Sequence, residues 1–450
     1  MLRRGSKLVM LCAVIAVVAA AAEKLAPTPP MGWNSWDAYG LTIDEEQFRA
    51  NAKVLVGLKH YGWNYAVDDE GWYFQDPQAQ PEARKSSWDS NGRLIPDAAR
   101  YPSAANGAGF KPLADWTHAQ GLKFGIHIVR GIPKGVVSEN LAVANSGFHA
   151  KDVADTSDLC PWDNGNFGVR DNPAGQAYYD SMMRLYASWG VDFLKVDCIA
   201  DHPYKPAEIR MIAAAIQKAR RPMVLSLSPG PTNLSHAAEV GEYSQMWRIA
   251  DDIWDGWDFH AGQFPSGILS AFDNLPKWAK FAKPGNWPDA DMLPWGSLTP
   301  HPGWGAPRQS RITPDEERTQ FTLWAISRSP LILGANLTKL DEFTRSLITN
   351  QEAIAIDQSA ISSAEITADP ADAGRMRIWS AATGGRQAKR YLAVFNLRES
   401  ALRRDLAWPD SLAGRAHAVY EIWSQRNVPG ATALHVELPP HGCALFRIER

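Results

Sequence analysis

Strand-like and helix-like segments alternate along most of this 450-residue chain, and no other feature constrains its fold as strongly. From Pro30 to near Leu340, short apolar runs are separated by longer amphipathic stretches. Alternation at this spacing predicts a parallel sheet whose strands are joined by crossover helices. About eight such units in about 320 residues fit a (β/α)8 TIM barrel, a fold that takes roughly 200 to more than 400 residues.

A doubly wound open sheet is the alternative architecture. It usually carries a glycine-rich phosphate loop after its first strand, and this chain has none there. For the barrel we expect strands at residues 33–36, 64–70, 122–129, 191–199, 222–229, 245–252 and 330–336, and helices at 44–59, 112–121, 176–189, 207–219 and 316–328. Between them, residues 286–292 read as a less regular segment.

The pattern changes near residue 364. From there, short alternating runs rich in β-branched and aromatic residues are punctuated by Pro, Gly, Asp and Asn, at 375–382, 390–397, 417–424 and 443–449. This pattern is typical of an antiparallel β-sandwich. We therefore expect a signal peptide at 1–22, a catalytic barrel at 23–360 and a β-sandwich at 361–450.

The first residues have the composition of a targeting signal. Arg3, Arg4 and Lys7 precede an apolar run at 8–18, and small residues at 19–22 supply a cleavage site. The run is too short for a spanning helix with ordinary flanks. We expect a secreted or periplasmic protein whose mature form is free of the membrane. An uncleaved anchor is the alternative.

Composition narrows the possible ligands. The net charge of −3 argues against a nucleic-acid footprint. The chain also has 19 tryptophans, many of them beside Gly, Asp or Pro, as in MGWNSWD and DDIWDGWD. Tryptophans in loops near carboxylates suit a site that stacks sugar rings, whereas core filling is the alternative explanation.

The stretch FLKVDCIAD at residues 193–201 resembles a buried strand but carries two charges. Lys195 and Asp197 are two residues apart, so their side chains point to the same face of the strand. Charged side chains are rarely fully buried unless they are paired. In a barrel, these two residues would lie on the inner face near the open end, where Lys195 would compensate Asp197.

Polar residues gather at the carboxyl ends of the expected strands, where barrels build their active sites. They are Trp36, Asp68, Asp69, Glu70, His127, Arg130, Lys195, Asp197, Ser226, Ser228, Arg248, Asp251 and Asp252. No metal motif and no Ser-His-Asp order accompanies these carboxylates, so we expect neither metal nor cofactor. Paired carboxylates predict glycoside hydrolysis, although a single aspartate at a strand end is often a helix N-cap.

Several motifs occur in an order typical of a known family. PPMGWNSWDAYG (29–40), the acidic pair after YAV, FLKVDC and WRIADDIWD are followed by PDADM (288–292) and TLWAISRSPLILGANL (322–337). In this order they resemble the α-galactosidases of glycoside hydrolase family 27, from about Pro29 to Asn336 and on into the sandwich.

The resemblance implies a role for each matching residue. Asp197 matches the nucleophile, and Asp252 matches the acid/base, with Asp251 as the neighbouring alternative. Lys195 and Arg248 match residues that bind substrate hydroxyls, and Trp36 matches the aromatic floor under the sugar. The implied mechanism is a double displacement with retention of configuration, for which the two carboxyl groups should lie about 5–5.5 Å apart.

The sequence departs from the family at three positions that bear on the sugar. The second strand reads D-D-E-G-W, one residue longer than usual, so either Asp68 and Asp69 or Asp69 and Glu70 form the sugar-binding pair. A glutamate at the second position would crowd the hydroxymethyl group of galactose and suit β-L-arabinopyranose. His127 replaces a common tyrosine, and Ser228 replaces a glutamate, leaving room near C2 as in N-acetylgalactosaminidases.

The sequence therefore predicts an exo-glycosidase that removes terminal α-D-galactosyl residues from oligosaccharides or polysaccharides. The alternatives are a β-L-arabinopyranosidase, an α-N-acetylgalactosaminidase of the same family, and an inactive carbohydrate-binding protein. The sequence gives no oligomeric state.

Three cysteines remain in the predicted mature chain: Cys160, Cys198 and Cys443. An oxidising compartment permits a disulfide, and we expect the pair Cys160–Cys198. Three buried thiols are the alternative.

Overall fold

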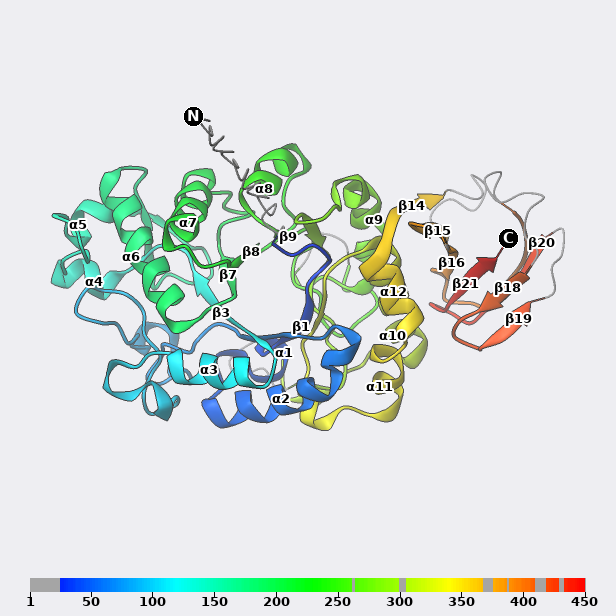
Figure 1. The fold of residues 1–450 in the computed structure, drawn as a ribbon, viewed down its shortest axis with the longest axis horizontal. Coiled ribbons are helices and arrows are strands. Elements are labelled where there is room, and N and C mark those ends of the chain that lie inside the picture. Colours follow the sequence, from blue (N-terminus) through cyan, green and yellow to red (C-terminus); the bar gives the residue numbers. More distant parts are fainter. Residues whose placement is uncertain are drawn as a thin grey trace, which may run out of the picture.

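The computed structural model describes residues 25–260, 264–298, 305–366, 375–386, 388–408, 418–428 and 433–449. The expected signal peptide, residues 1–22, lies outside these ranges. Figure 1 shows a large helix-rich domain beside a smaller domain of strands, with α10 (Pro314–Ser327) and α12 (Gln351–Ser359) on the side facing the smaller domain. Within the described ranges, no helix is long and apolar enough to cross a membrane.

Eight parallel strands of the large domain form one curled sheet, in which the first seven strands pair in chain order. They are β1 (Met31–Asn34), β2 (Tyr65–Asp68), β3 (Lys123–Val129), β7 (Phe193–Asp197), β8 (Val224–Leu227), β9 (Met246–Arg248), β10 (Trp287–Asp289) and β13 (Leu331–Leu333). The last strand, β13, also pairs in parallel with β1.

The gap between β10 and β13 is bridged just beyond β10. Leu293 forms a parallel bridge with Leu333, and its amide donates to the carbonyl of Ile332 at 2.8 Å. This contact brings the last strand back to the seventh. The expected TIM-barrel architecture is confirmed.

Helices surround the sheet, and local sequence signals fix their ends. They include α2 (Glu45–Leu58), α3 (Lys111–Ala119), α6 (Pro173–Trp189), α7 (Pro206–Ala219), α8 (Ala237–Tyr243) and α9 (Ile268–Trp278). The first of these begins with a capping box, in which the Asp44 carboxylate accepts from the amide of Gln47 at 2.8 Å. In α6, Asn172 caps the start, and Gly190 ends the helix with a left-handed φ of 93°.

Two apolar layers lie on the two faces of the sheet. Tyr65, Val67 and Phe193 belong to the cluster that fills the barrel interior. Ala66 and Leu194, which alternate with them, pack in the layer shared with the helices. Because side chains on a strand alternate between faces, the residues that follow Val67 and Phe193 at steps of two also face inward.

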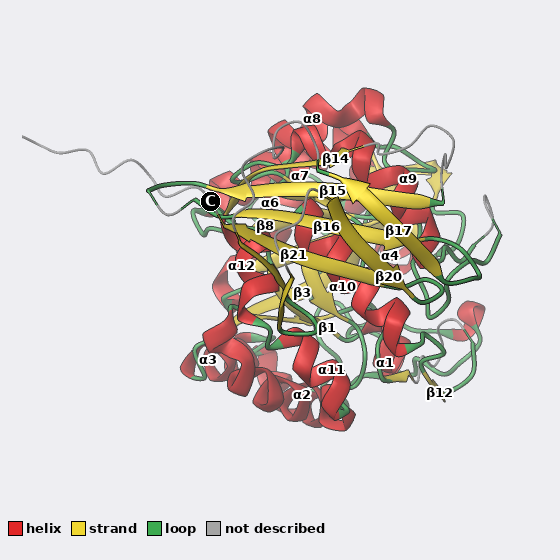
Figure 2. Cartoon of the chain, turned by 90° about the vertical axis from the view of Figure 1, so that its right-hand side faces the viewer, coloured by secondary structure: helices red, strands yellow, loops and turns green. Residues whose placement is uncertain are grey.

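The C-terminal domain contains two antiparallel sheets (Figure 2). The larger has the order β14 (Ala360–Ile366), β15 (Met376–Thr383), β16 (Arg390–Asn396), β21 (Cys443–Glu449), β18 (Ala418–Glu421) and β19 (Arg426–Val428). The smaller pairs β17 (Leu402–Ala407) with β20 (Ala433–Leu438). Apolar residues from both sheets share one core, so the expected β-sandwich is confirmed.

The sandwich docks on the barrel helix α10 through polar as well as apolar contacts. Thr319 donates to the carbonyl of His441 at 2.6 Å, and the indole of Trp423 donates to the hydroxyl of Thr322 at 3.0 Å. These bonds satisfy polar groups that docking would otherwise leave without partners.

Some sequence expectations for individual elements were wrong. The segment expected to be less regular contains the barrel strand β10, which has only three residues and therefore shows no periodicity. Trp36 begins a short helix, α1 (Trp36–Tyr39), instead of ending a strand. The sequence also did not predict β17, whose letters LRRDLA include three charged residues that hide the alternation.

One prediction follows from the close packing of the first two barrel strands. Gly32 lies opposite Tyr65, and a Cβ atom added at Gly32 would lie 2.2 Å from the Tyr65 carbonyl oxygen. We expect Gly32→Ala to lower the free energy of unfolding by about 1–3 kcal/mol, because the backbone must move to admit the methyl group.

The matched control is Gly57→Ala on the exposed face of α2, where an added Cβ meets nothing within 4 Å. This change should stabilise the protein by roughly 0.5–1 kcal/mol, since alanine favours helix more than glycine does. Thermal and urea unfolding of both variants provide the measurement. Equal stability of Gly32→Ala and the wild type would contradict this packing account.

Candidate active site

A cavity of about 1390 Å³ opens at the carboxyl ends of the barrel strands. Eight of the ten residues that the sequence singles out as catalytic or substrate-binding line it: Trp36, Asp69, Glu70, His127, Lys195, Asp197, Ser228 and Asp252. The other two, Asp68 and Arg248, are buried behind its wall. Side chains from six barrel strands or from the residues just after them therefore converge on one space.

A buried ion pair lies at the bottom of this space. The ammonium of Lys195 is 3.0 Å from Oδ2 of Asp69, and the amide of Asn34 donates to the same oxygen at 2.5 Å. Burial alone would raise the pKa of Asp69, but Lys195 and His127 lower it below its usual value. Burial would likewise lower the pKa of Lys195, yet Asp69 raises it, so both groups are charged at neutral pH.

Lys195 thus pairs with Asp69, whereas the sequence predicted that it compensates Asp197. The register explains the choice, because His127 in β3 lies opposite Lys195 in β7, and β2 lies on the other side of β3. The long lysine side chain reaches across β3 to Asp69. Burial lowers the pKa of His127, so this imidazole is neutral near pH 7.

Consecutive carboxyl groups after β2 lie in different surroundings. Asp68 faces outward like Ala66, close to Tyr101 and Arg100, whereas Asp69 and Glu70 line the cavity. Burial raises the pKa of Asp68 to about 8. Burial, together with the carboxylates of Asp163 and Asp197, raises the pKa of Glu70 well above its usual value. Of the two pairings that the sequence left open, Asp69 and Glu70 share the cavity.

Asp197 receives a hydrogen bond that sequence reasoning did not predict. The indole nitrogen of Trp162 donates to its Oδ2 at 3.1 Å, and Trp162 itself is 44% exposed on the cavity wall. Asp163 and Gly165 from the same loop also line the cavity. Nothing in the residues PWDNG (161–165) indicates that this loop reaches the end of β7.

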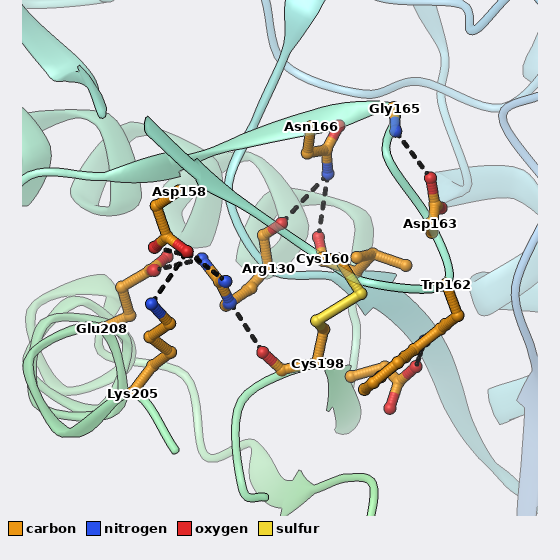
Figure 3. The surroundings of a disulfide bond; sticks show 12 residues. Arg130, Asp158, Cys160, Trp162, Asp163, Gly165, Asn166, Cys198, Lys205 and Glu208 are labelled. Atoms are coloured by element: carbon orange, nitrogen blue, oxygen red, sulfur yellow. Dashed lines mark hydrogen bonds and ion pairs between the residues drawn. A yellow bond between two sulfur atoms is a disulfide. The ribbon is translucent and has the colours of Figure 1, made fainter. Parts of the chain in front are cut away.

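A disulfide connects this loop to the residue after Asp197 (Figure 3). The expected Cys160–Cys198 pair is confirmed, with its Cα atoms 6.0 Å apart, and the third cysteine, Cys443, is free and buried. Cys198 has a left-handed φ of 61°, a conformation that an L-residue rarely adopts. The disulfide brings residues 160–165 over the cavity from the side of β7.

Arg130 supports the same turn from the side away from Trp162 (Figure 3). Its Nε donates to the carbonyl of Cys198 at 2.6 Å, and its guanidinium forms ion pairs with Asp158 at 2.9 Å and Glu208 at 2.8 Å. Lys205 also pairs with Asp158, at 2.8 Å. The buried charge of Arg130 is therefore compensated, and the chain on both sides of the disulfide is fixed.

At the end of β9, two strands along the sheet from β7, Arg248 connects two aspartates. It lies 3.1 Å from Oδ1 of Asp252 and 2.8 Å from Oδ1 of Asp291. Oδ2 of Asp291 accepts from the amide of Ile253 at 2.7 Å, which fixes the backbone next to Asp252. Burial raises the pKa of Asp291 to about 7 although Arg248 opposes the shift. Asp251 also lines the cavity, and its carboxylate accepts from the amide of Asp252 at 2.9 Å.

Both parts of the chain match models of known families. Residues 160–359 match the model described as alpha galactosidase A, and residues 373–448 match the alpha galactosidase C-terminal beta sandwich domain. An alpha-galactosidase A of Cellvibrio japonicus is 31% identical over 347 residues, which cover 75% of this chain and 69% of that protein.

Solved structures resemble the whole chain. A family 27 β-L-arabinopyranosidase from Geobacillus stearothermophilus is 38% identical, with a TM-score of 0.88 over 94% of this chain and 97% of that one. A variant of that enzyme in complex with arabinose matches equally well. A Bacillus halodurans protein provisionally assigned as an α-N-acetylgalactosaminidase is 36% identical, with a TM-score of 0.81 over 95% of this chain and all of that one.

A pH-dependent stability follows from the buried carboxyl of Asp68. Its pKa of about 8 exceeds the unfolded value near 4, so folding keeps it protonated. Its contribution is complete below about pH 4 and is lost as the pH rises through about 8. The side-chain amide of Asp68→Asn cannot ionise. At pH 9 we therefore expect the free energy of unfolding of this variant to exceed that of the wild type by a few kcal/mol.

The measurement is the melting temperature of both proteins from pH 5 to pH 9. Glu317, whose pKa burial raises to about 7, titrates in both proteins and cancels in the difference. Parallel profiles over this range would show that Asp68 is ionised in the folded state.

Proposed function

This chain belongs to glycoside hydrolase family 27, and we propose that it is a retaining exo-glycosidase that removes terminal β-L-arabinopyranosyl residues from oligosaccharides or polysaccharides. One observation carries this choice of sugar: Glu70, instead of a shorter residue, lines the cavity beside the ionised Asp69. β-L-Arabinopyranose has the ring configuration of α-D-galactose but lacks its hydroxymethyl group, so it leaves room for the extra methylene of Glu70.

The protonation of Glu70 fits a sugar-binding role. The raised pKa of Glu70 favours its protonated form, which can donate a hydrogen bond to a sugar hydroxyl. Asp69, held ionised by Lys195, can only accept hydrogen bonds. Protonated Glu70 thus offers a hydrogen-bond donor beside the acceptor oxygens of Asp69. Together they favour one orientation of the substrate's hydroxyl groups.

The proposed chemistry uses two aspartates that line the cavity, Asp197 after β7 and Asp252 after β9. Asp197 attacks the anomeric carbon, while Asp252 donates its proton to the leaving oxygen. The resulting ester joins the sugar to Asp197. Asp252 then takes a proton from water as that water attacks the anomeric carbon and displaces the carboxylate of Asp197. Two inversions give net retention.

Side chains around each aspartate support these roles. The Trp162 indole fixes Oδ2 of Asp197, which leaves the other carboxylate oxygen for attack. Arg248 and the adjacent backbone, tied to Asp291, orient Asp252. Trp36 lines the cavity with an aromatic surface suited to the apolar face of a sugar ring.

The second candidate is an α-galactosidase, because the family models and the Cellvibrio japonicus relative carry that name. An α-N-acetylgalactosaminidase is a third, since the small Ser228 lines the cavity. We also propose that the protein is secreted or periplasmic. The Cys160–Cys198 disulfide supports this location, because disulfides persist in oxidising compartments.

The central test compares the aryl β-L-arabinopyranoside, α-D-galactoside and α-N-acetylgalactosaminide. We expect the largest kcat/KM for the arabinopyranoside. Hydrolysis of every aryl glycoside that the enzyme accepts should depend on Asp197. Asp197→Ala should lower kcat by about 10⁴-fold or more, whereas Asp115→Ala, an exposed carboxylate on α3, should leave it unchanged. Proton NMR of the first product anomer should show retention; an inverted product would reject the double displacement.

Glu70 provides a separate test of sugar choice. Glu70→Asp shortens the side chain by one methylene, so we expect the galactoside to arabinopyranoside ratio of kcat/KM to rise by about tenfold or more. Asp163→Asn is the control, because it removes a charge near Glu70 without opening space beside the sugar. If the ratio does not change in Glu70→Asp, crowding by Glu70 does not select the sugar.

A further inference from the structure

The cavity extends well beyond the carboxylates used above, onto a side formed by two other segments. Arg84, Lys85 and Trp88 come from the stretch after β2, and Lys134 begins α4 (Lys134–Glu139) after β3. We call Arg84, Lys85 and Lys134 the basic side. The acidic residues that line the cavity, by contrast, are Asp69, Glu70, Asp163, Asp197, Asp251 and Asp252.

Packing of Trp88 brings the two segments of the basic side together. A Cβ atom added at Gly135 would lie 2.4 Å from Cη2 of Trp88, so the indole rests directly on the backbone beside Lys134. Ser86, next to Lys85, pairs with Phe74 in a short antiparallel bridge. Trp88 is only half-buried and lines the cavity together with the three cations, so the same side also offers an aromatic surface.

The charges of the basic side are not compensated within the part of the chain that the structure describes. Arg84 donates its Nε to the carbonyl of Ala79 at 3.1 Å and lies 5.8 Å from the Phe74 ring centroid. The ammonium of Lys134 lies 5.3 Å from the ring centroid of Phe167. None of the three cations forms an ion pair with a described carboxylate, whereas Lys195 at the cavity bottom is paired with Asp69.

We propose that the basic side is an aglycone subsite for an anionic sugar, a hexuronic acid residue in the saccharide that carries the terminal sugar. This inference rests on the proposed exo-glycosidase activity, which places the terminal sugar near Asp197 and the remaining saccharide toward the cavity opening. A uronate carboxylate accepts charge-assisted hydrogen bonds from Arg84 and attracts both lysines. Trp88 offers a stacking surface for its ring.

The experiment compares two disaccharides that differ only at C6 of the second sugar, which is a carboxylate in one and a hydroxymethyl group in the other. The terminal sugar of each disaccharide is the one whose aryl glycoside the enzyme hydrolyses best. It is joined by the same linkage to glucuronic acid in one disaccharide and to glucose in the other. The readout is the ratio of kcat/KM for the uronate over the neutral disaccharide, in 20 mM and in 1 M NaCl. Taking this ratio within one enzyme removes differences in folding or active-enzyme content. One variant combines Arg84→Gln, Lys85→Gln and Lys134→Gln. The control is Lys277→Gln, which changes an exposed cation on α9 outside the cavity.

We expect a ratio of about ten or more for the wild type and Lys277→Gln at low salt, falling toward one in 1 M NaCl because salt screens exposed charges. In the triple variant the ratio should be near one at both salt concentrations. A wild-type ratio of one or less, or a high ratio that survives in the triple variant, would overturn the inference.

Failure of the proposed function would look different, since then no aryl glycoside would be hydrolysed. The subsite is tested in that case by calorimetric titration with trigalacturonic acid, with maltotriose as the neutral ligand. Binding of trigalacturonic acid that weakens at least tenfold in the triple variant supports the subsite without turnover. Equal or absent binding in the wild type and the triple variant rejects it.

Discussion

The ion pair between Lys195 and Asp69 is the contact on which the rest of the cavity depends. It joins β7 to the residue after β2 across the intervening strand β3, so three neighbouring strands must end together at the barrel mouth. Both groups are almost entirely buried, and removing either partner would leave an uncompensated charge, at a cost of about 3–5 kcal/mol. Asn34 adds a fourth strand through its bond to Asp69. The pair thus fixes the relative positions of Trp36, His127 and Asp197.

The alternation of residues in FLKVD was enough to predict the inner face of β7. Lys195 and Asp197 are two residues apart and therefore lie on one face of the strand, whereas Leu194 and Val196 lie on the other. The same alternation, applied to β2, separates Asp68 from Asp69, since Tyr65 and Val67 fill the barrel interior. Matching motifs letter by letter left that choice open. The partner of Lys195 could not be read from the sequence, because it depends on the lateral spacing of strands that are far apart in the chain.

The covalent anchor beside Asp197 shows why a correct cysteine pairing still left much of the site unknown. The sequence suggested Cys160–Cys198 but not the indole bond from Trp162, since a loop of this kind has no periodic signal. Cys198 adopts a left-handed φ of 61°, which costs about 1–3 kcal/mol. The disulfide, together with the Arg130 bond to the Cys198 carbonyl, offsets this cost and directs residues 160–165 over the end of β7. Strain next to Asp197 is therefore maintained from two sides.

Three consecutive carboxyl groups, Asp68, Asp69 and Glu70, place little negative charge at the barrel mouth. Asp68 is buried on the outer face of the barrel with a pKa of about 8, and burial and neighbouring carboxylates raise the pKa of Glu70 well above its usual value. The pKa of Asp69 is instead lowered, and Lys195 compensates its charge. The extra residue in D-D-E-G-W therefore places a longer side chain on the cavity wall, in surroundings that disfavour a further negative charge near Asp197. A long side chain whose ionisation is disfavoured narrows the cavity beside Asp69 while adding little to the negative charge around Asp197.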